Sequence, residues 1–395
     1  MNALQKKNIL FSILFIAILT PVIFFVMGIP MILQMKGYDA ALIGSFQLIG
    51  LPMVFKFIMS APIDRYVFEK RHYKKWIFYS GIVYALLLVY ISFLSLEDNI
   101  SLIFVAIFIT ALISTFIDIP LNALAIKIFT EEERFNASTY KVAAYSIAAM
   151  LGSGVFLLFY NHLGWRSTFI LMSVMLLVSL YILNFIEEPD EVIKEEKVSL
   201  KKIISFFKQK DISIWIFILG FYFAFISAIW VFMKPYLISK GVKADDIAIY
   251  VGIYGSLIGF LGALLISKFA NNFSRKTLLL AFIVFNIISA SILVYIEQAE
   301  LTLFSLILSI TFIALSISLS SAIIFTMIMD YARKETRAID YSIQASFFSL
   351  TRIISAVIAG LIISTFNFQI MFIFETIGMI IVCIFIYKFY KSKKK

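Results

Sequence analysis

Residues 48–75 read LIGLPMVFKFIMSAPIDRYVFEKRHYKK, and this stretch decides the class of fold. Its first part is an apolar run of helical character that carries one charge, Lys56. Its second part starts near Pro62, continues with the acid–base pair Asp64 and Arg65, and ends in a loop rich in basic residues. An apolar helix that runs into a basic loop is typical of a membrane span that meets the cytoplasm. The stretch therefore predicts a membrane protein.

The composition of the whole chain supports this interpretation. Of the 395 residues, 62% are hydrophobic and only 15% are charged. A water-soluble chain of this length could not bury so much apolar surface, so we expect the lipid bilayer to be its main surroundings. The net charge of +10 does not indicate nucleic-acid binding, because the basic residues lie in short loops between apolar segments. The two histidines lie in loops too far apart to suggest a metal site, and the single cysteine can form no disulfide within the chain.

At about 20 residues per span, the sequence contains twelve apolar segments. They are predicted at 9–35, 40–62, 76–96, 100–126, 138–161, 166–186, 212–235, 245–267, 277–296, 301–329, 340–364 and 367–390. The longest polar interval divides them evenly. We therefore expect an all-α membrane protein with an N-terminal six-helix bundle over 1–186, a cytoplasmic linker over 187–211, and a C-terminal six-helix bundle with a basic tail over 212–395.

The distribution of Lys and Arg predicts the orientation. Both termini and the loops on their side hold 26 of the 34 basic residues, whereas the opposite loops hold five. This bias places both termini in the cytoplasm, in a bacterial-type inner membrane. The first span has no cleavage pattern, so we expect no cleaved signal peptide.

The two halves also repeat weakly at a shift of 203 residues. The shift places residues 130–134 over 333–337 and residues 163–165 over 366–368, so that a charged loop and then a short turn recur with the same spacing. A shift close to half the chain suggests two parallel six-helix repeats.

Ionisable residues inside the apolar segments are the first candidates for function. They are Lys56, Asp118, Lys141, Arg352 and Glu375. A charge at membrane depth costs about 2.5–3.5 kcal/mol on insertion scales, so such residues usually face a bundle interior or a water-filled cavity.

Asp118 is the most informative of these residues. It lies two residues before Pro120, which frees backbone carbonyls, and one turn before Asn122. An acid beside such an irregularity is either a proton or substrate site or one half of a structural ion pair, for instance with Lys141.

The other charges leave the same two alternatives open. Arg352 and Lys56 either bind an anionic group of a substrate or neutralise a nearby acid. Glu375, in the last apolar segment, is expected to be peripheral and structural.

Charges near the loops are candidates for a cytoplasmic gate. Asp64 can cap a helix terminus or pair with a base of the next bundle, with Arg65 and Arg71 beside it, and so hold this side shut in one state. The alternative is an ordinary basic loop. Asp330 and Asp340, at the ends of the helices around a later basic loop, are assigned to the same gate.

The segment 212–235 contains an aromatic run with Phe221, Tyr222 and Phe225. These side chains either line a cavity or pack between helices. No phosphate-binding loop, metal-ligand cluster or nucleophile–base arrangement appears in the sequence, so we expect no enzyme and no cofactor. Secondary transport driven by a proton gradient is the default expectation.

Residues 50–66 resemble the G-L-P-x-x-x-K-x-x-x-[SA]-P-x-x-D-R-Y pattern of the peptide–acetyl-coenzyme A transporter branch of the major facilitator superfamily. That branch includes AmpG-type muropeptide permeases and RhtX/FptX-type siderophore importers. Residues 118–134 and 329–344 resemble two looser patterns of the branch. The resemblance implies the major facilitator fold, with twelve helices in two pseudo-symmetric bundles that open alternately. It also implies that the helices of Lys56 and Arg352 face each other.

Two positions depart from the muropeptide pattern. Asn122 stands where that pattern has a second acid, and Ser146 stands where it has an arginine. The region of Asp330, Asp340 and Tyr341 leans towards the siderophore importers. We expect a monomer that imports a bulky polar small-molecule or peptidic substrate, such as a muropeptide, together with protons. The alternatives are a ferric siderophore importer, a drug or metabolite efflux pump, and a non-transporting membrane sensor.

Overall fold

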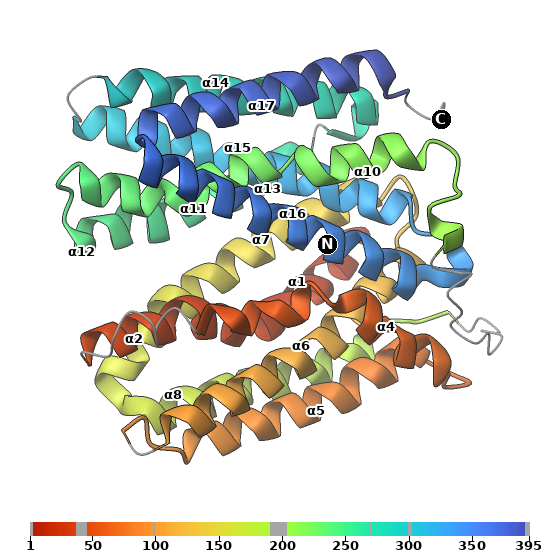
Figure 1. Ribbon diagram of the computed structural model, residues 1–395. Helices are drawn as coiled ribbons and strands as arrows, with labels where there is room; N and C mark the ends of the chain where they lie inside the picture. The colour runs from red at the N-terminus through yellow and green to blue at the C-terminus, as the bar shows by residue number, and fades with distance from the viewer. Residues whose placement is uncertain are drawn as a thin grey trace. The chain divides into compact units, whose positions relative to one another are not determined.

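The structure is a computed structural model that describes residues 3–36, 46–97, 99–189, 204–268, 270–298 and 302–391 (Figure 1). All regular secondary structure in these residues is helical. The α-helices of the first half are α1 (Ala3–Ile23), α2 (Ile29–Met35), α4 (Lys56–Arg65), α5 (His72–Ser92), α6 (Ile100–Ile128), α7 (Arg134–Met150) and α8 (Phe156–Tyr181). Those of the second half are α10 (Ile212–Phe221), α11 (Ala224–Ser239), α12 (Ala244–Ile247), α13 (Gly255–Ser267), α14 (Arg275–Glu297), α15 (Leu303–Asp330), α16 (Arg337–Thr365) and α17 (Phe368–Phe389).

Short π-helical and 3₁₀ segments join or extend these helices. The π-helical segments are η1 (Phe24–Gly28), η3 (Leu151–Val155) and η5 (Ala248–Tyr254). The 3₁₀ segments are η2 (Phe46–Met53), η4 (Ile182–Phe185), η6 (Ala270–Asn272) and η7 (Lys334–Thr336).

Ten helical stretches in the described residues are long and apolar enough to cross a membrane. One of them, Arg134–Phe185, is 52 residues long and bends at Gly164, whose φ of 76° and ψ of 177° are not helical. It therefore contains both the fifth and the sixth predicted segment. The predicted segment 40–62 lies partly outside the described residues, and its described part contains η2 and the start of α4. The chain is a multi-pass membrane protein.

The described chain forms two compact units that do not coincide with the sequence halves. Unit 1 contains Met1–Thr130, Ala144–Ile203 and Tyr331–Ser346, and unit 2 contains Glu131–Ala143, Ile204–Asp330 and Phe347–Lys395. The chain passes from one unit to the other within α7 and, 203 residues later, within α16. The first turns of each of these helices thus belong with the unit of the other sequence half. Whether the two halves are the domains, with 187–211 as their linker, stays a prediction.

The helix boundaries follow the repeat seen in the sequence. Helices α5 and α14, α6 and α15, and α7 and α16 each begin 203 residues apart. The packing follows it as well. In unit 1, α5 packs against α6 and α8, and α1 packs against α6 and α8; in unit 2, α14 packs against α15 and α17, and α11 packs against α15 and α17 (Figure 1). The two units therefore build their cores from corresponding pairs of helices.

A close helix contact in unit 1 involves Gly152 in η3. A Cβ atom at this position would lie 2.7 Å from the backbone oxygen of Thr20 and 3.0 Å from the side chain of Ile23. A Cβ atom on Gly154, two residues later, would meet no atom of a neighbouring segment within 4 Å. The small residues of this segment thus allow η3 to lie against the end of α1.

Replacing Gly152 by Ala is expected to destabilise the protein by about 1–3 kcal/mol, because backbone atoms must move to admit the methyl group. The matched substitution Gly154→Ala has open space and is expected to change the free energy of unfolding by less than about 1 kcal/mol. Denaturant unfolding of the purified protein measures both values. Equal effects of the two substitutions would contradict the close contact at Gly152.

Candidate functional site

Helix α6 holds the central acid of the candidate site, Asp118. The helix continues through Pro120, and its residues from Ile119 to Ile126 are all buried, so this turn faces protein rather than lipid. Asn122, one turn after Asp118, donates from Nδ2 to the backbone oxygen of Asp118 at 2.7 Å and to its Oδ1 at 3.0 Å. Asn122 therefore fixes the carboxylate of Asp118 from within the same helix.

Lys56 reaches Asp118 from the first residue of α4. The 3₁₀ segment η2, which contains Pro52, ends just before it, and Phe55 has the non-helical angles φ −96° and ψ 17°. The interruption starts a new helix at Lys56, whose Nζ lies 2.6 Å from Oδ2 of Asp118. The side chains of Lys56 and Asp118 are only 10% and 14% exposed, so little water screens this ion pair.

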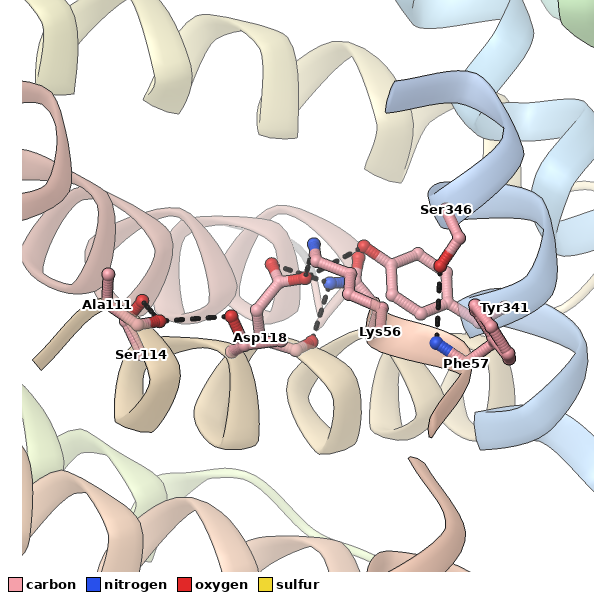
Figure 2. A network of polar contacts seen from close by, with 9 residues as sticks. Lys56, Phe57, Ala111, Ser114, Asp118, Tyr341 and Ser346 are labelled. Carbon is pink, nitrogen blue, oxygen red and sulfur yellow. Dashed lines mark hydrogen bonds and ion pairs between the residues drawn. The ribbon is translucent and has the colours of Figure 1, made fainter. Parts of the chain in front are cut away.

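Tyr341 is the third side chain at the carboxylate. It lies in the first turns of α16 that belong to unit 1, and its hydroxyl donates to Oδ2 of Asp118 at 3.0 Å (Figure 2). The Nζ of Lys56 also lies 5.8 Å from the centre of the Tyr341 ring. A further bond joins α4 to α16, since the backbone N–H of Phe57 donates to Oγ of Ser346 at 3.2 Å. We call Lys56, Asp118, Asn122 and Tyr341 the acid cluster.

The acid cluster can act as a proton-dependent connection. The ionised carboxylate of Asp118 accepts from Lys56, Tyr341 and Asn122, which together satisfy both oxygens. A proton on Asp118 would remove the charge that holds Lys56 and would weaken the bond from Tyr341, because bonds to charged groups are the stronger ones. Protonation would thus loosen α4 and α16 from α6.

Replacing Tyr341 by Phe is expected to lower the free energy of unfolding by about 1.5–3 kcal/mol, because a hydrogen bond to a charged acceptor is lost. Ser346→Ala, on the same helix, removes a bond between neutral groups and is expected to cost about 0.5–1.5 kcal/mol. Denaturant unfolding of the two purified variants gives the comparison. A smaller cost for Tyr341→Phe than for Ser346→Ala would mean that Asp118 is not charged in the folded protein.

Asp330, one predicted gate residue, lies in unit 2 between two arginines. Its Oδ1 is 3.1 Å from Nη1 of Arg134, and its Oδ2 is 3.0 Å from Nε of Arg275. Arg275 also donates from Nη2 to the backbone oxygen of Glu131 at 3.2 Å. Asp330 and its two arginines thus join the start of α7 to α14 and to the end of α15. Such a connection fits both a gate and a purely structural role.

Asp340, the second acid of this region, is fully buried in unit 1. Its oxygens accept from Nε and Nη2 of Arg333 at 2.8 Å each and from the backbone N–H of Arg333 at 2.9 Å. These bonds raise the pKa of Arg333 above its ordinary value. The pair closes the turn that precedes α16.

The predicted gate of the loop after α4 is only partly described. The side chain of Asp64 lies outside the described residues. Arg65 is exposed and lies over the ring of Tyr66 at 5.7 Å. Arg71 is also exposed, and it directly precedes α5 in the left-handed conformation with φ 54°. A gating role for these residues stays a prediction.

The two remaining intramembrane bases lie against aromatic rings of unit 2. Nζ of Lys141 is 4.3 Å from the ring centre of Phe325. The guanidinium carbon of Arg352 is 5.4 Å from the ring of Phe223 and 5.6 Å from that of Phe348. Such contacts stabilise a cation in an apolar setting. A substrate role for either base stays a prediction.

The predicted aromatic run makes packing contacts. Tyr222 is fully buried, and its hydroxyl donates to the backbone oxygen of Leu279 at 2.9 Å. Phe225 lies against Gly378 of α17, and Phe221 is 43% exposed. These contacts favour the packing interpretation over a cavity lining.

One buried ion pair, between Lys127 and Glu188 in unit 1, was not expected from the sequence. The two side chains are 2% and 0% exposed, and Nζ of Lys127 is 3.2 Å from Oε1 of Glu188. Glu188 also accepts from the backbone N–H groups of Tyr73 and Lys74 at 3.3 and 3.1 Å. The pair thus caps the start of α5. Both residues looked like ordinary loop charges, because nothing in their neighbourhood marks them as partners.

Comparison with known proteins places these features in a family context. The sequence matches the Major Facilitator Superfamily over residues 9–338, with a second match over 255–395. A relative from Rickettsia prowazekii (strain Madrid E), named "Putative transporter AmpG 3", is 24% identical over 412 residues, which cover 99% of this chain and 98% of the relative. The anhydromuropeptide permease of Escherichia coli (strain K12) is 24% identical over 177 residues, which cover 44% of this chain and 36% of that protein.

Solved structures have the same fold. The transporter FucP, in the outward conformation, superposes with a TM-score of 0.70 at 16% identity and covers 97% of this chain and 98% of its own. The proton:xylose symporter XylE superposes with a TM-score of 0.71 at 12% identity and covers 99% and 96%. At these identities the likeness shows the fold alone, and it confirms the predicted fold class.

Proposed function

Since the chain belongs to the Major Facilitator Superfamily, we propose that it is a proton-coupled importer of a muropeptide that works by alternating access. Family membership confirms the expected transporter, in place of an enzyme. The finer proposal adds the driving ion, the direction and the substrate. It also places the protein in an inner membrane with both termini in the cytoplasm, as the distribution of Lys and Arg indicates.

The acid cluster carries the proposal of proton coupling. A carboxylate in an apolar helix, with both oxygens occupied and a lysine 2.6 Å away, holds three segments together only while it is ionised. A proton taken up by Asp118 from outside would release Lys56 and Tyr341, and loss of that proton to the inside would restore them. Movement of α4 and α16 relative to α6 would then follow the proton gradient.

Similarity to named relatives supports the choice of substrate. The Rickettsia relative named AmpG 3 aligns along nearly its whole length, and the Escherichia coli anhydromuropeptide permease aligns over part of its length. Muropeptides carry carboxylates, and Arg352 and Lys141 are the bases that unit 2 could offer to them. The changes at Asn122 and Ser146 make a direct comparison with ferric siderophores necessary.

The test is uptake into proteoliposomes that contain the purified protein. An imposed pH gradient, acidic outside, is expected to drive accumulation of an anhydromuropeptide, and a proton ionophore is expected to stop it. Accumulation of a ferric siderophore instead would replace the substrate. Proton-linked expulsion of drugs would make the protein an efflux pump. No accumulation of any of these solutes would favour a membrane sensor.

A further inference from the structure

Glu375 is a buried acid that the acid cluster does not use. It lies in α17, is fully buried, and neither of its carboxyl oxygens has a hydrogen-bond partner among the described residues. It occupies the buried stripe of the helix. That stripe consists of Met371, Phe372, Glu375, Gly378, Met379, Val382 and Ile386. The sequence led us to expect a peripheral residue, but the side chain points into the core of unit 2.

The contacts on either side of Glu375 are with one helix, α11. Three residues before it, the ring of Phe372 packs edge-on against Tyr236 with ring centres 5.2 Å apart. Three residues after it, a Cβ on Gly378 would lie 2.6 Å from the ring of Phe225. Glu375 therefore lies between two close contacts of α11 with α17. Helix α11 starts at Ala224, directly after a break at Tyr222 and Phe223 that separates it from α10.

No charged group on the helices around α17 compensates Glu375. Helices α10, α11 and α14 pack against α17, and α10 has no ionisable residue. On α11, Lys234 is exposed and the Tyr236 hydroxyl is buried without a partner in the described chain. On α14, Arg275 pairs with Asp330, and Glu297 pairs with Lys240. Lys276 of the same helix donates to the backbone oxygen of Tyr387, and Tyr295 is exposed. On α17 itself, Lys388 lies in the last turn and Cys383 two turns after Glu375.

An ionised carboxylate in this place would lack both water and a counter-charge, which costs several kcal/mol. The side chain is therefore a neutral carboxylic acid while α11 packs on α17. We infer that Glu375 is a second protonation site, which holds a proton while α11 lies against α17 and releases it to water when α11 moves away. On release the O–H bond breaks, its electron pair stays on the carboxylate, and water takes the proton.

The direction of the pH effect follows from this linkage. The packed arrangement binds one proton more than the separated one, so a rise in pH favours separation of α11 from α17. A side chain that cannot ionise would keep α11 packed at every pH. The inference does not depend on the substrate, so failure of muropeptide uptake would leave it standing.

Infrared difference spectroscopy of the full-length protein in vesicles tests the protonation state. At neutral pH the wild type is expected to show the C=O band of a protonated carboxylic acid without a hydrogen-bond partner. In Glu375→Gln the intensity of this band is expected to fall by the contribution of one carboxyl group. The exposed control Glu132→Gln should retain the band. A wild-type spectrum without this band, or an unchanged band in Glu375→Gln, would overturn the inference.

Hydrogen exchange of the α11 amides tests the coupling. After correction for intrinsic exchange, the wild-type rate is expected to rise by up to about tenfold per pH unit, as linkage to one proton requires. Glu375→Gln should show no such slope. Glu375→Met, which is apolar and of similar length, is expected to lose both the infrared band and the pH slope. It replaces the Gln variant if that variant does not fold. A slope that persists in a folded variant, or no slope in the wild type, would refute the coupling.

Discussion

Replacing Asp118 by Asn is expected to reduce proton-driven accumulation of solute to the level of protein-free vesicles. Asn keeps the size of the side chain and can still bond to Tyr341 and Asn122, but it can neither bind a proton nor neutralise Lys56. The gradient can then no longer act through the acid cluster. Exchange of labelled for unlabelled solute across the vesicle, which needs no gradient, is expected to persist and separates loss of coupling from loss of the transporter.

Stability has to be controlled in this experiment, because Asp118→Asn leaves Lys56 without the partner that it has in the structure. Removing one member of a buried pair costs about 3–5 kcal/mol, and somewhat less here because both side chains retain some exposure. The double variant with Lys56→Met is expected to regain stability and to remain unable to accumulate solute. Glu97→Gln, in an exposed pair, should change neither property. Full accumulation by Asp118→Asn would refute the coupling role.

The sequence predicted the fold well where apolar periodicity and helix length determine it. Eleven of the twelve predicted segments correspond to the long apolar helices, once Arg134–Phe185 is divided at Gly164. The interruption at Phe55 that starts α4 at Lys56, and the break at Tyr222 and Phe223, were not expected. Both occur in strongly apolar runs, where hydropathy indicates a continuous span and says nothing of local backbone angles.

The partners within the site were much less predictable. The sequence identified Asp118, Asn122 and Lys56 as candidates, but it did not pair Asp118 with Lys56, whose Nζ lies 2.6 Å from the carboxylate. Tyr341, 223 residues away from Asp118, stood out in the sequence only through the resemblance of residues 329–344 to a family pattern. Pairing over such separations is decided by tertiary packing, and neither charge at membrane depth nor spacing along the chain specifies it.

The buried pair of Lys127 and Glu188 is expected to have the largest effect on stability. Glu188→Gln keeps an acceptor for the start of α5, whose N–H groups it caps, but leaves the charge of Lys127 buried and uncompensated. The expected loss is about 3–5 kcal/mol in the free energy of unfolding. Lys127→Met is expected to cost less, because the positive end of the α5 dipole and its N–H groups still stabilise the carboxylate.

A double-mutant cycle separates this pair from general damage to the fold. The double variant Lys127→Met, Glu188→Gln removes both charges and keeps the acceptor, so it is expected to be more stable than Glu188→Gln alone. Glu97→Gln, which breaks the exposed pair with Lys36, is expected to cost less than about 1 kcal/mol. Denaturant unfolding in detergent, followed by tryptophan fluorescence, measures all four variants. If the two single losses simply add in the double variant, Lys127 and Glu188 do not stabilise each other, and the cap on α5 must act through its backbone bonds alone.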